Sequence, residues 1–394
     1  MSRVDPAAHT LSGRSSRIAV TVLTTMALLL AAPLSAAAKR PAGPVRSAAA
    51  AVVGSTGVFA IDNDHHTVVF IPGAGGTPRP VAAGLTAPTQ IAASRAGSVF
   101  IVDGTRLLKV TPRGVVQTIR TAMAPRARIA VDDNNWLFVL DGSKVVKYSP
   151  RDGSSPVPVG TAPAYTYATL TVDAVGNASL TGPNPADYQS TVITTYPVRG
   201  GKPTSRILVA DYNPNQTFFN SPSGVVEARD GTIYLQTEES GGSGASDLYQ
   251  VPVGPPGKAV AYDASPRYSE YAFTVDTASR FYLLQNRLWC TAVGRDEGTC
   301  VDDYGVDAVQ RYAPSGGGRV DVAVTGVDLP VGGISVASSG SMYAAVLVSR
   351  SARDTNSTAV PRMLRIDPAG GAAVVLAQGH FSMPVAENFL FYGR

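Results

Sequence analysis

The sequence has 394 residues, of which 44% are hydrophobic and 16% are charged, so the chain is long enough to bury a large core. Its formal net charge of +4 is small for this length, and no run of Lys and Arg alternates with aromatic residues. These properties exclude a nucleic-acid-binding groove and leave at most a weak attraction to anionic polymers of the cell envelope. The 39 Gly and 29 Pro are spread along the chain as turn signals, which excludes a disordered low-complexity tract.

Residues 1–38 are predicted to be an export signal peptide. Three arginines precede the apolar run 18–30, and Ala36, Ala37 and Ala38 supply small residues for cleavage. The run is shorter than the roughly 20 residues of a membrane span, which favours removal over a retained anchor. No cysteine follows it, so a lipoprotein is not expected. We therefore expect a flexible N-terminus at residues 39–51, a folded domain at residues 52–394, no membrane span after cleavage, and a secreted or cell-envelope-associated protein.

The folded domain repeats one pattern seven times: a short strand closes near a proline, and a glycine follows within a few residues. The segments are VVFIPGAGG, LLKVTPRG, VVKYSPRDG, ITTYPVRGG, LYQVPVG, VQRYAPSGGG and MLRIDPAGG. Proline ends a strand because it has no N–H to donate to a sheet, and glycine adopts the positive φ that tight turns require. The seven prolines are Pro72, Pro112, Pro150, Pro197, Pro252, Pro314 and Pro368.

Further strands surround each of these segments. The first unit is predicted to contain strands at 58–62 and 67–71. The second unit contains 90–93, 99–103, 107–111 and 115–120, and the third contains 128–131, 137–141, 145–149 and 156–159. The later units open with strands at 168–172, 224–228, 272–275 and 333–337. Four strands in about forty residues is the propeller period, so we predict an all-β, seven-bladed β-propeller, with six or eight blades as alternatives.

The last residues, PVAENFLFYGR, resemble two additional strands. We predict that residues 384–392 pair with strands from residues 52–71, so that N- and C-terminal strands close one blade. Val58–Ile61 and Phe389–Tyr392 compete for a single position in that blade, and the sequence leaves open which of them occupies it.

The segment IAVDDNNWLFVLDGSKVVKYSPRDG resembles an NHL-type repeat, because an apolar strand is followed by a polar turn and by a strand that ends in Asp. The chain is similar to secreted actinobacterial propellers and to the extracellular sensor propellers of receptor kinases, without the kinase. This resemblance implies the fold and not a function, since propellers serve as enzymes and as binding proteins. The strand-ending Asp is present in the first three units and is replaced in the others. The replacements are Gly182, Thr237, Asn286 and Val346.

Long insertions are concentrated in units four to seven. Strand direction alternates within a blade, so links between the second and third strands lie at the same face as links between blades. All the insertions are links of these two kinds, which predicts a recognition surface at that face; neutral drift of surface loops is the alternative. The insertions are 181–191, 211–222, 237–247, 263–271, 286–308 and 348–362.

Aromatic and charged residues of these insertions form the predicted ligand-binding set. Aromatic side chains on loops bind sugars or peptides because they bury much area at little entropic cost, although they can instead fold back over the blades. The predicted function is therefore non-catalytic binding of a protein, peptide or cell-envelope glycan, with no cofactor. The set comprises Tyr212, Phe218, Phe219, Tyr268, Tyr271, Trp289, Glu238 and Arg353.

The two cysteines, Cys290 and Cys300, lie in one insertion of an exported chain, which predicts a disulfide bond between them rather than a metal site. A bond that closes so short a loop should stabilise the insertion by roughly 2–3 kcal/mol at most.

The sequence offers little evidence for catalysis. His65 and His66 fall in a tight turn, His380 stands alone, and no serine has a recognisable base. Glu227 and Glu387 lie on predicted innermost strands and are weak candidates for a metal such as Ca²⁺ in the central channel. Such a site would make the protein a metal-dependent hydrolase, lactonase or lyase, which is the alternative function. Further oxygen ligands could come from Asp132, Asp173, Asp276 and Asn388.

Overall fold

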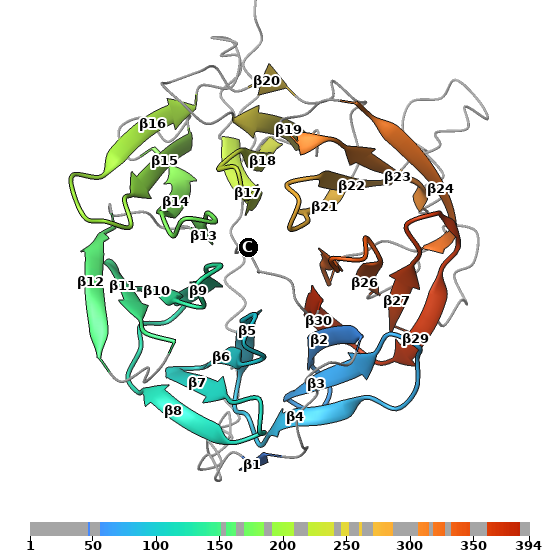
Figure 1. Ribbon diagram of the computed structural model, residues 1–394, viewed down its shortest axis with the longest axis horizontal. Helices are drawn as coiled ribbons and strands as arrows, with labels where there is room; N and C mark the ends of the chain where they lie inside the picture. Colours follow the sequence, from blue (N-terminus) through green and yellow to red (C-terminus); the bar gives the residue numbers. More distant parts are fainter. Residues whose placement is uncertain are drawn as a thin grey trace, which may run out of the picture. The chain divides into compact units, whose positions relative to one another are not determined.

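The computed structural model describes residues 46–47, 56–150, 155–162, 169–184, 191–208, 220–239, 246–251, 260–261, 271–286, 306–314, 318–327, 332–346 and 361–386. All of them lie in the second of the chain's two units, Ala42–Arg394. None of these residues belongs to a helix that could cross a membrane. The strands form seven small antiparallel sheets in a ring, which is a seven-bladed β-propeller (Figure 1). The prediction of an all-β fold with seven blades is confirmed.

The strands of each blade follow one another from the central channel to the outer edge of the ring. Blade 1 contains β30 (Phe381–Ala386), β2 (Gly57–Asp62), β3 (Thr67–Pro72) and β4 (Arg79–Ala83), with β1 (Arg46–Ser47) at its outer edge. Blade 2 contains β5 (Pro88–Ala93), β6 (Val99–Asp103), β7 (Arg106–Val110) and β8 (Val116–Arg120). Blade 3 contains β9 (Arg128–Val131), β10 (Leu137–Asp141), β11 (Lys144–Tyr148) and β12 (Pro156–Thr161). The predicted strands of units two and three agree with these bounds to within two residues.

The strands of the remaining blades vary more in length. Blade 4 contains β13 (Thr169–Val172), β14 (Ala178–Pro183), β15 (Thr191–Tyr196) and β16 (Thr204–Leu208). Blade 5 contains β17 (Asn220–Glu227), β18 (Ile233–Glu239), β19 (Ser246–Val251) and β20 (Val260–Ala261). Blade 6 contains β21 (Tyr271–Val275), β22 (Phe281–Asn286), β23 (Val306–Tyr312) and β24 (Val320–Val327). Blade 7 contains β25 (Ile334–Val336), β26 (Met342–Val346), β27 (Arg362–Ile366) and β29 (Val374–Gln378), and β28 (Gly371–Ala372) joins the edge of blade 6.

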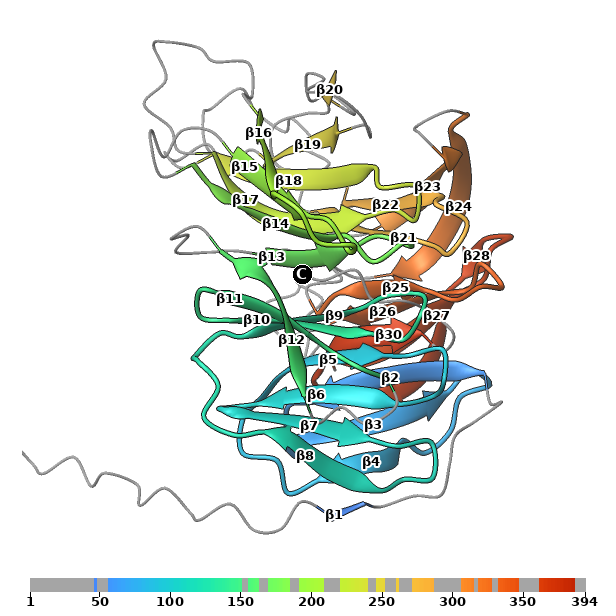
Figure 2. The ribbon, with the colours of Figure 1, turned by 60° about the vertical axis from the view of Figure 1, so that its left-hand side comes forward.

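Neighbouring blades pack face to face, and Figure 2 shows β13–β16 of blade 4 beside β17–β20 of blade 5. Strands alternate their side chains between two faces, so each inner strand contributes to the interface on either side of its blade. The buried apolar side chains therefore form clusters between blades. One cluster, for example, combines Phe138 of blade 3 with Leu170 and Val172 of blade 4.

The aspartates that end the second strand in blades 2 and 3 attach the preceding link to the blade. Asp103 Oδ1 accepts hydrogen bonds from the backbone N–H groups of Thr86 and Ala87, at 2.8 and 2.7 Å. Asp141 Oδ1 accepts one from Ala124 N–H at 2.6 Å. Each bond gives a hydrogen-bond acceptor to a backbone N–H group of the segment between two blades. Without the aspartate these partly buried N–H groups would have no acceptor. This is the structural role of the strand-ending aspartate in the repeat.

Blade 1 is closed by β30, which takes the inner position. β30 pairs antiparallel with β2, and Val58 lies opposite Ala386 and Phe59 opposite Val385. The prediction of a blade shared between the two ends of the chain is confirmed. Its bounds need correction, because the closing strand begins at Phe381, three residues before the predicted segment. Val58–Ile61 occupies the second position, and Phe389–Tyr392 lies outside the described residues.

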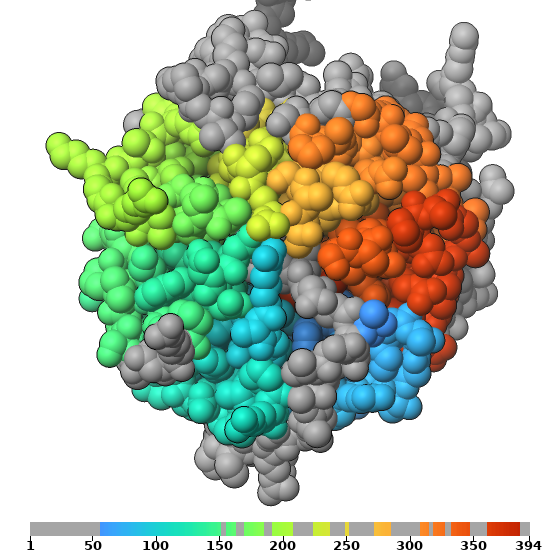
Figure 3. Space-filling model, in the orientation of Figure 1, coloured from blue at the N-terminus to red at the C-terminus, as the bar shows by residue number. Residues whose placement is uncertain are grey.

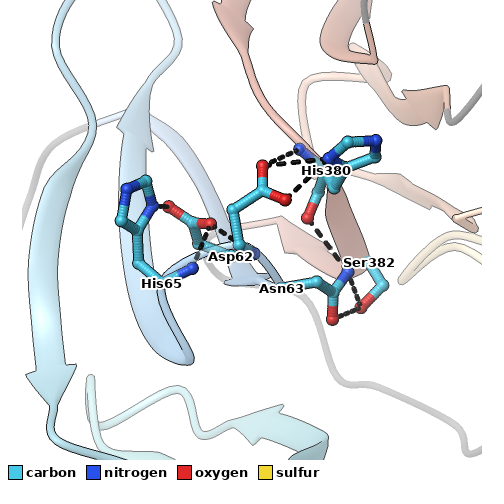
Figure 4. A network of polar contacts seen from close by, with 6 residues as sticks. Asp62, Asn63, His65, His380 and Ser382 are labelled. Atoms are coloured by element: carbon cyan, nitrogen blue, oxygen red, sulfur yellow. Dashed lines mark hydrogen bonds and ion pairs between the residues drawn. The ribbon is translucent and has the colours of Figure 1, made fainter.

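A cluster of polar contacts joins the link before β30 to the β2–β3 turn (Figure 4). The carbonyl oxygen of His380 accepts hydrogen bonds from the backbone N and side-chain Nδ2 of Asn63, both at 2.9 Å. The backbone N–H of His380 donates to Asp64 Oδ2 at 3.2 Å, and the His380 ring lies 2.7 Å from Asp64 Oδ1. These two contacts, the backbone bond first, lower the pKa of the Asp64 carboxyl group. His380 stands alone in the sequence, and the fold places it beside Asp64. His65 lies in the predicted turn, where a bond to Asp62 raises its pKa.

Candidate functional site

The strand order divides the connections between two faces of the ring. Turns that join first to second and third to fourth strands lie at one face, which we call the short-turn face. Links from second to third strands and from blade to blade lie at the other, which we call the long-loop face. The six predicted insertions connect β14 to β15, β16 to β17, β18 to β19, β20 to β21, β22 to β23 and β26 to β27. Both ends of every insertion therefore lie at the long-loop face of blades 4 to 7.

Two of the predicted ligand-binding residues fall on described strands. Tyr271 begins β21 and Glu238 is the last residue but one of β18, and both of these strand ends lie at the long-loop face. The other predicted ligand-binding residues lie outside the described residues, as do Cys290, Cys300 and Glu387. They are Tyr212, Phe218, Phe219, Tyr268, Trp289 and Arg353.

Three of the carboxylates proposed for a channel metal cap their own turns at the short-turn face. Asp132 Oδ1 accepts hydrogen bonds from the N–H groups of Asn134 and Trp136, at 2.9 and 2.7 Å. Burial raises the pKa of Asp132, and these bonds oppose the shift. Asp173 and Asp276 accept the equivalent backbone bonds of their turns at 2.8–3.0 Å. Among the described residues, no three His, Cys, Asp or Glu side chains are grouped so that they could hold a metal ion.

Ion pairs connect the turns around the channel at the short-turn face. Asp133 of blade 3 lies 3.4 Å from Arg95 of blade 2 and forms a second ion pair with Arg229 of blade 5. Arg229 also donates to the carbonyl oxygen of Thr277 in blade 6, at 3.1 Å. In the space-filling view, cyan atoms of blade 2 meet yellow-green atoms of blade 5 beside the centre (Figure 3). Four blades are thus tied together at this face, which indicates a structural role for these charges.

The blades share a packing rule at the inner end of each interface. In six blades the second-strand residue that lies opposite the last inner-strand residue but one is aromatic, and it belongs to the same apolar cluster as the last inner-strand residue of the next blade. Tyr282 of blade 6, for example, packs with Val336 of blade 7. The six aromatic residues are Phe59, Phe100, Phe138, Tyr234, Tyr282 and Tyr343. The last inner-strand residue is Ala93, Val131, Val172, Val275, Val336 or Ala386 in six blades.

The interface between blades 4 and 5 breaks this rule on both sides. Ser179 occupies the aromatic position in blade 4, where it lies opposite Thr171 in the β13–β14 register. Glu227 occupies the small apolar position at the end of β17 in blade 5. The missing aromatic ring provides the space that the carboxyl group fills. The two departures therefore belong together, and they replace an apolar contact with a buried polar one.

Glu227 is 3% exposed and points toward blade 4. The Thr171 hydroxyl donates a hydrogen bond to Glu227 Oε2 at 2.6 Å. The Ser179 hydroxyl, which also lies 3.1 Å from the Thr195 hydroxyl, takes part in the same group. Burial raises the pKa of Glu227 to about 8, and the hydrogen bond from Thr171 opposes this shift. Transfer of a carboxylate out of water favours its neutral form, so the carboxyl group keeps its proton at neutral pH.

The sequence singled out Glu227 as a channel residue, and the structure corrects its direction. Side chains of an inner strand point alternately toward the two neighbouring blades, so Glu227 points to the same side as Val225, two residues before it. Val225 packs with Ile193 of blade 4. Ser179 was missed altogether. An alignment of the seven second strands would have shown it, because serine is the single departure from an aromatic column.

Glu227 makes the stability of the propeller depend on pH. The folded protein holds this proton up to a pKa of about 8, whereas the unfolded chain releases it near 4.5. Between these values the unfolded state binds fewer protons, so the free energy of unfolding is expected to fall by about 1.4 kcal/mol per pH unit. The stabilisation is complete below the lower pKa, decreases as the pH rises and is lost above the higher one.

Denaturant unfolding at several pH values between these limits, in low-salt buffer, measures this slope. Glu227→Gln should remove it, because the amide keeps the shape of the neutral carboxyl group and does not titrate. Asp321→Asn is the matched control, since the Asp321 side chain is 50% exposed and the slope should remain. A Glu227→Gln protein with the slope of the parent would contradict the assignment.

The comparisons with known proteins agree with the fold. No protein-family model matches the chain, and no curated protein matches it. A puromycin-hydrolyzing peptidase of Mycobacterium tuberculosis is 11% identical to this chain, with a TM-score of 0.52. The match covers 85% of this chain and 53% of the peptidase. A lignostilbene dioxygenase of Pseudomonas brassicacearum is 9% identical, with a TM-score of 0.51, and the match covers 87% of this chain and 94% of the dioxygenase. The extracellular domain assigned to a one-component system of B. thetaiotaomicron is 10% identical, with a TM-score of 0.46. That match covers 75% of this chain and 38% of the other.

These similarities concern the architecture alone. The chain spans about half of the peptidase, and the identities are too low to carry an activity from one protein to another. The structural similarity therefore shows the fold alone. The function has to be argued from the residues of this chain.

Proposed function

We propose that the protein is an exported, non-catalytic propeller that binds a protein, peptide or cell-envelope glycan through the long-loop face of blades 4 to 7. The observation that carries this proposal is the position of the insertions. Four long links, β16–β17, β20–β21, β22–β23 and β26–β27, connect strand ends at one face, whereas the inner turns at the opposite face are short and tied by ion pairs. The other two predicted insertions are shorter than expected, because β14 extends to Pro183 and β18 to Glu239. Loop length is tolerated at either face, so such a bias favours selection for recognition.

The chemistry of the insertions supports an extended ligand. They contain several aromatic residues together with acidic and basic ones, a composition that suits a polymer or a protein surface. A small substrate would require a deep pocket with convergent polar groups. The described channel carboxylates are engaged in their own turns, and Glu227 faces the blade 4–5 interface. The alternative of a channel enzyme is therefore not favoured by the described residues.

Replacement of Phe218 or Tyr271 by Ala is expected to weaken ligand binding by roughly 1–4 kcal/mol each, the range for anchoring aromatic residues. A screen of cell-envelope polysaccharides and immobilised peptides identifies the ligand, and titration calorimetry then measures the variants. The matched control is Val175→Ala, because Val175 is 62% exposed in a turn of the short-turn face.

The melting temperature of all three variants should stay close to that of the parent, since Phe218 and Tyr271 belong to predicted insertions and Val175 to an exposed turn. Equal affinity of the Phe218→Ala, Tyr271→Ala and Val175→Ala proteins would exclude the long-loop face as the binding surface.

A further inference from the structure

The interface between blades 4 and 5 contains a row of side-chain oxygen atoms. Thr171 lies opposite Ser179, and Thr169 lies opposite Thr181, two residues further toward the long-loop face. Residues opposite each other share a face, and residues two apart along a strand share it as well. All four hydroxyls therefore project from the face of blade 4 that meets Glu227. We call these four residues and Glu227 the blade 4–5 seam.

Two hydroxyls of the seam are buried without a partner. Neither Thr169 Oγ1 nor Thr181 Oγ1 has a hydrogen bond, and Thr181 is fully buried. A buried hydroxyl without a partner is unfavourable, so protein interiors rarely contain one. Thr169 and Thr181 lie on adjacent strands and face the same interface, where their oxygen atoms are available to a ligand.

Glu227 is neutral below its pKa of about 8 and carries a negative charge above it. No ion pair within the described part of the chain includes Glu227. Arg206 favours the ionised carboxylate from a distance, and the negative charge of Asp173 opposes it. Val225, which points to the same side of β17 as Glu227, belongs to an apolar cluster with Ile193 of blade 4 and with Ile233 and Val251 of blade 5. An ionised carboxylate in such surroundings requires a positive partner.

The donors determine which positive partner fits. The seam offers one carboxylate and several hydroxyls, and it contains no sulfur or imidazole. Oxygen ligands of this kind select hard cations over zinc or copper. A single carboxylate balances a single positive charge, whereas a divalent ion would leave a net charge between two packed blades.

We propose that the blade 4–5 seam binds a hard monovalent cation such as Na⁺, with the Glu227 carboxylate as the charged ligand and the hydroxyls of Thr171, Ser179 and Thr181 as neutral oxygen ligands. The cation connects the two blades in place of the aromatic contact that the other interfaces use. It also stabilises the half of the ring that carries the insertions.

Thermal unfolding of the full chain in NaCl and in choline chloride, at equal ionic strength and one alkaline pH, tests the proposal. NaCl should raise the melting temperature of the parent by about 2 °C or more above its value in choline chloride. Glu227→Gln should abolish this difference, and Thr181→Val, which keeps the volume and removes one oxygen, should reduce it by half or more.

The matched control is Thr274→Val, which removes a buried hydroxyl at the position of Thr171 but in blade 6. This variant should keep the full response to NaCl. A parent with equal melting temperatures in the two salts would overturn the proposal, and so would a Glu227→Gln protein that responds as the parent does. A response to CaCl₂ or MgCl₂ in the absence of a response to NaCl would overturn the assignment of a monovalent ion.

Discussion

A protein truncated after His380, which lacks residues 381–394, is expected to lose cooperative unfolding. The truncation removes β30, whose buried side chains Phe381, Val385 and Ala386 are at most 1% exposed. Loss of a large buried apolar side chain costs about 2–5 kcal/mol, and typical domains are stable by only about 5–15 kcal/mol. The truncation also leaves β2 without its hydrogen-bonded neighbour, and an open sheet edge invites aggregation. Circular dichroism during heating should show a broad transition or none.

Two point variants on β30 should lower the stability of the protein by different amounts. Phe381→Ala should destabilise the protein by about 3–5 kcal/mol, because the ring is buried between blades 1 and 7. Ser382→Ala removes only a partly exposed bond to Asn63 and should cost about 1 kcal/mol or less. A truncated protein that melts within about two degrees of the parent would show that β30 does not close the ring.

The start of β30 could not be predicted correctly from the sequence. The predicted closing segment began at Pro384, and proline is rarely found inside a sheet. In the structure Pro384 lies within β30, at an irregularity of the β2–β30 pairing where Met383 has a φ of 51°. A bulge tolerates proline since one residue there is left unpaired. Nothing in the local sequence distinguishes such a bulge from a strand end.

The repeat itself could be predicted because its causes are local. The proline and glycine that close each third strand act through their own backbone chemistry, and the alternating apolar residues require no knowledge of their partners. The strand at Val99–Asp103, for example, was predicted with the bounds that it has in the structure. The blade number followed from the number of repeats.

The candidate site could not be predicted in the same way. Glu227 and Ser179 are 48 positions apart in the sequence, and either residue alone is ordinary in a strand. Their meaning depends on the pairing of blade 4 with blade 5, which decides that the carboxyl group takes the space left by the absent ring. The ion pairs of Asp133 with Arg95 and Arg229 were missed for the same reason, because each charge looks like a solvated turn residue.

Restoration of the repeat at this interface is expected to stabilise the protein and to remove the polar seam. In the double variant Ser179→Phe/Glu227→Val, the ring fills the position that six other blades give to an aromatic residue, and a valine replaces the buried acid. Burial of an aromatic side chain in a core stabilises a protein by about 3–5 kcal/mol, and part of this is lost to the hydroxyls that keep no partner. The double variant should therefore be more stable than the parent by roughly 1–4 kcal/mol.

The single variants separate this explanation from a general gain in hydrophobicity. Ser179→Phe alone places a ring against the Glu227 carboxyl group and should cost about 1–3 kcal/mol through overpacking. Glu227→Val alone removes the acceptor of the Thr171 bond and should bring no more than a small gain. The free energies of unfolding, measured as a double-mutant cycle, should thus show a favourable coupling of about 2 kcal/mol or more between the two positions. Additive effects would mean that Ser179 and Glu227 are independent substitutions and do not form one polar site.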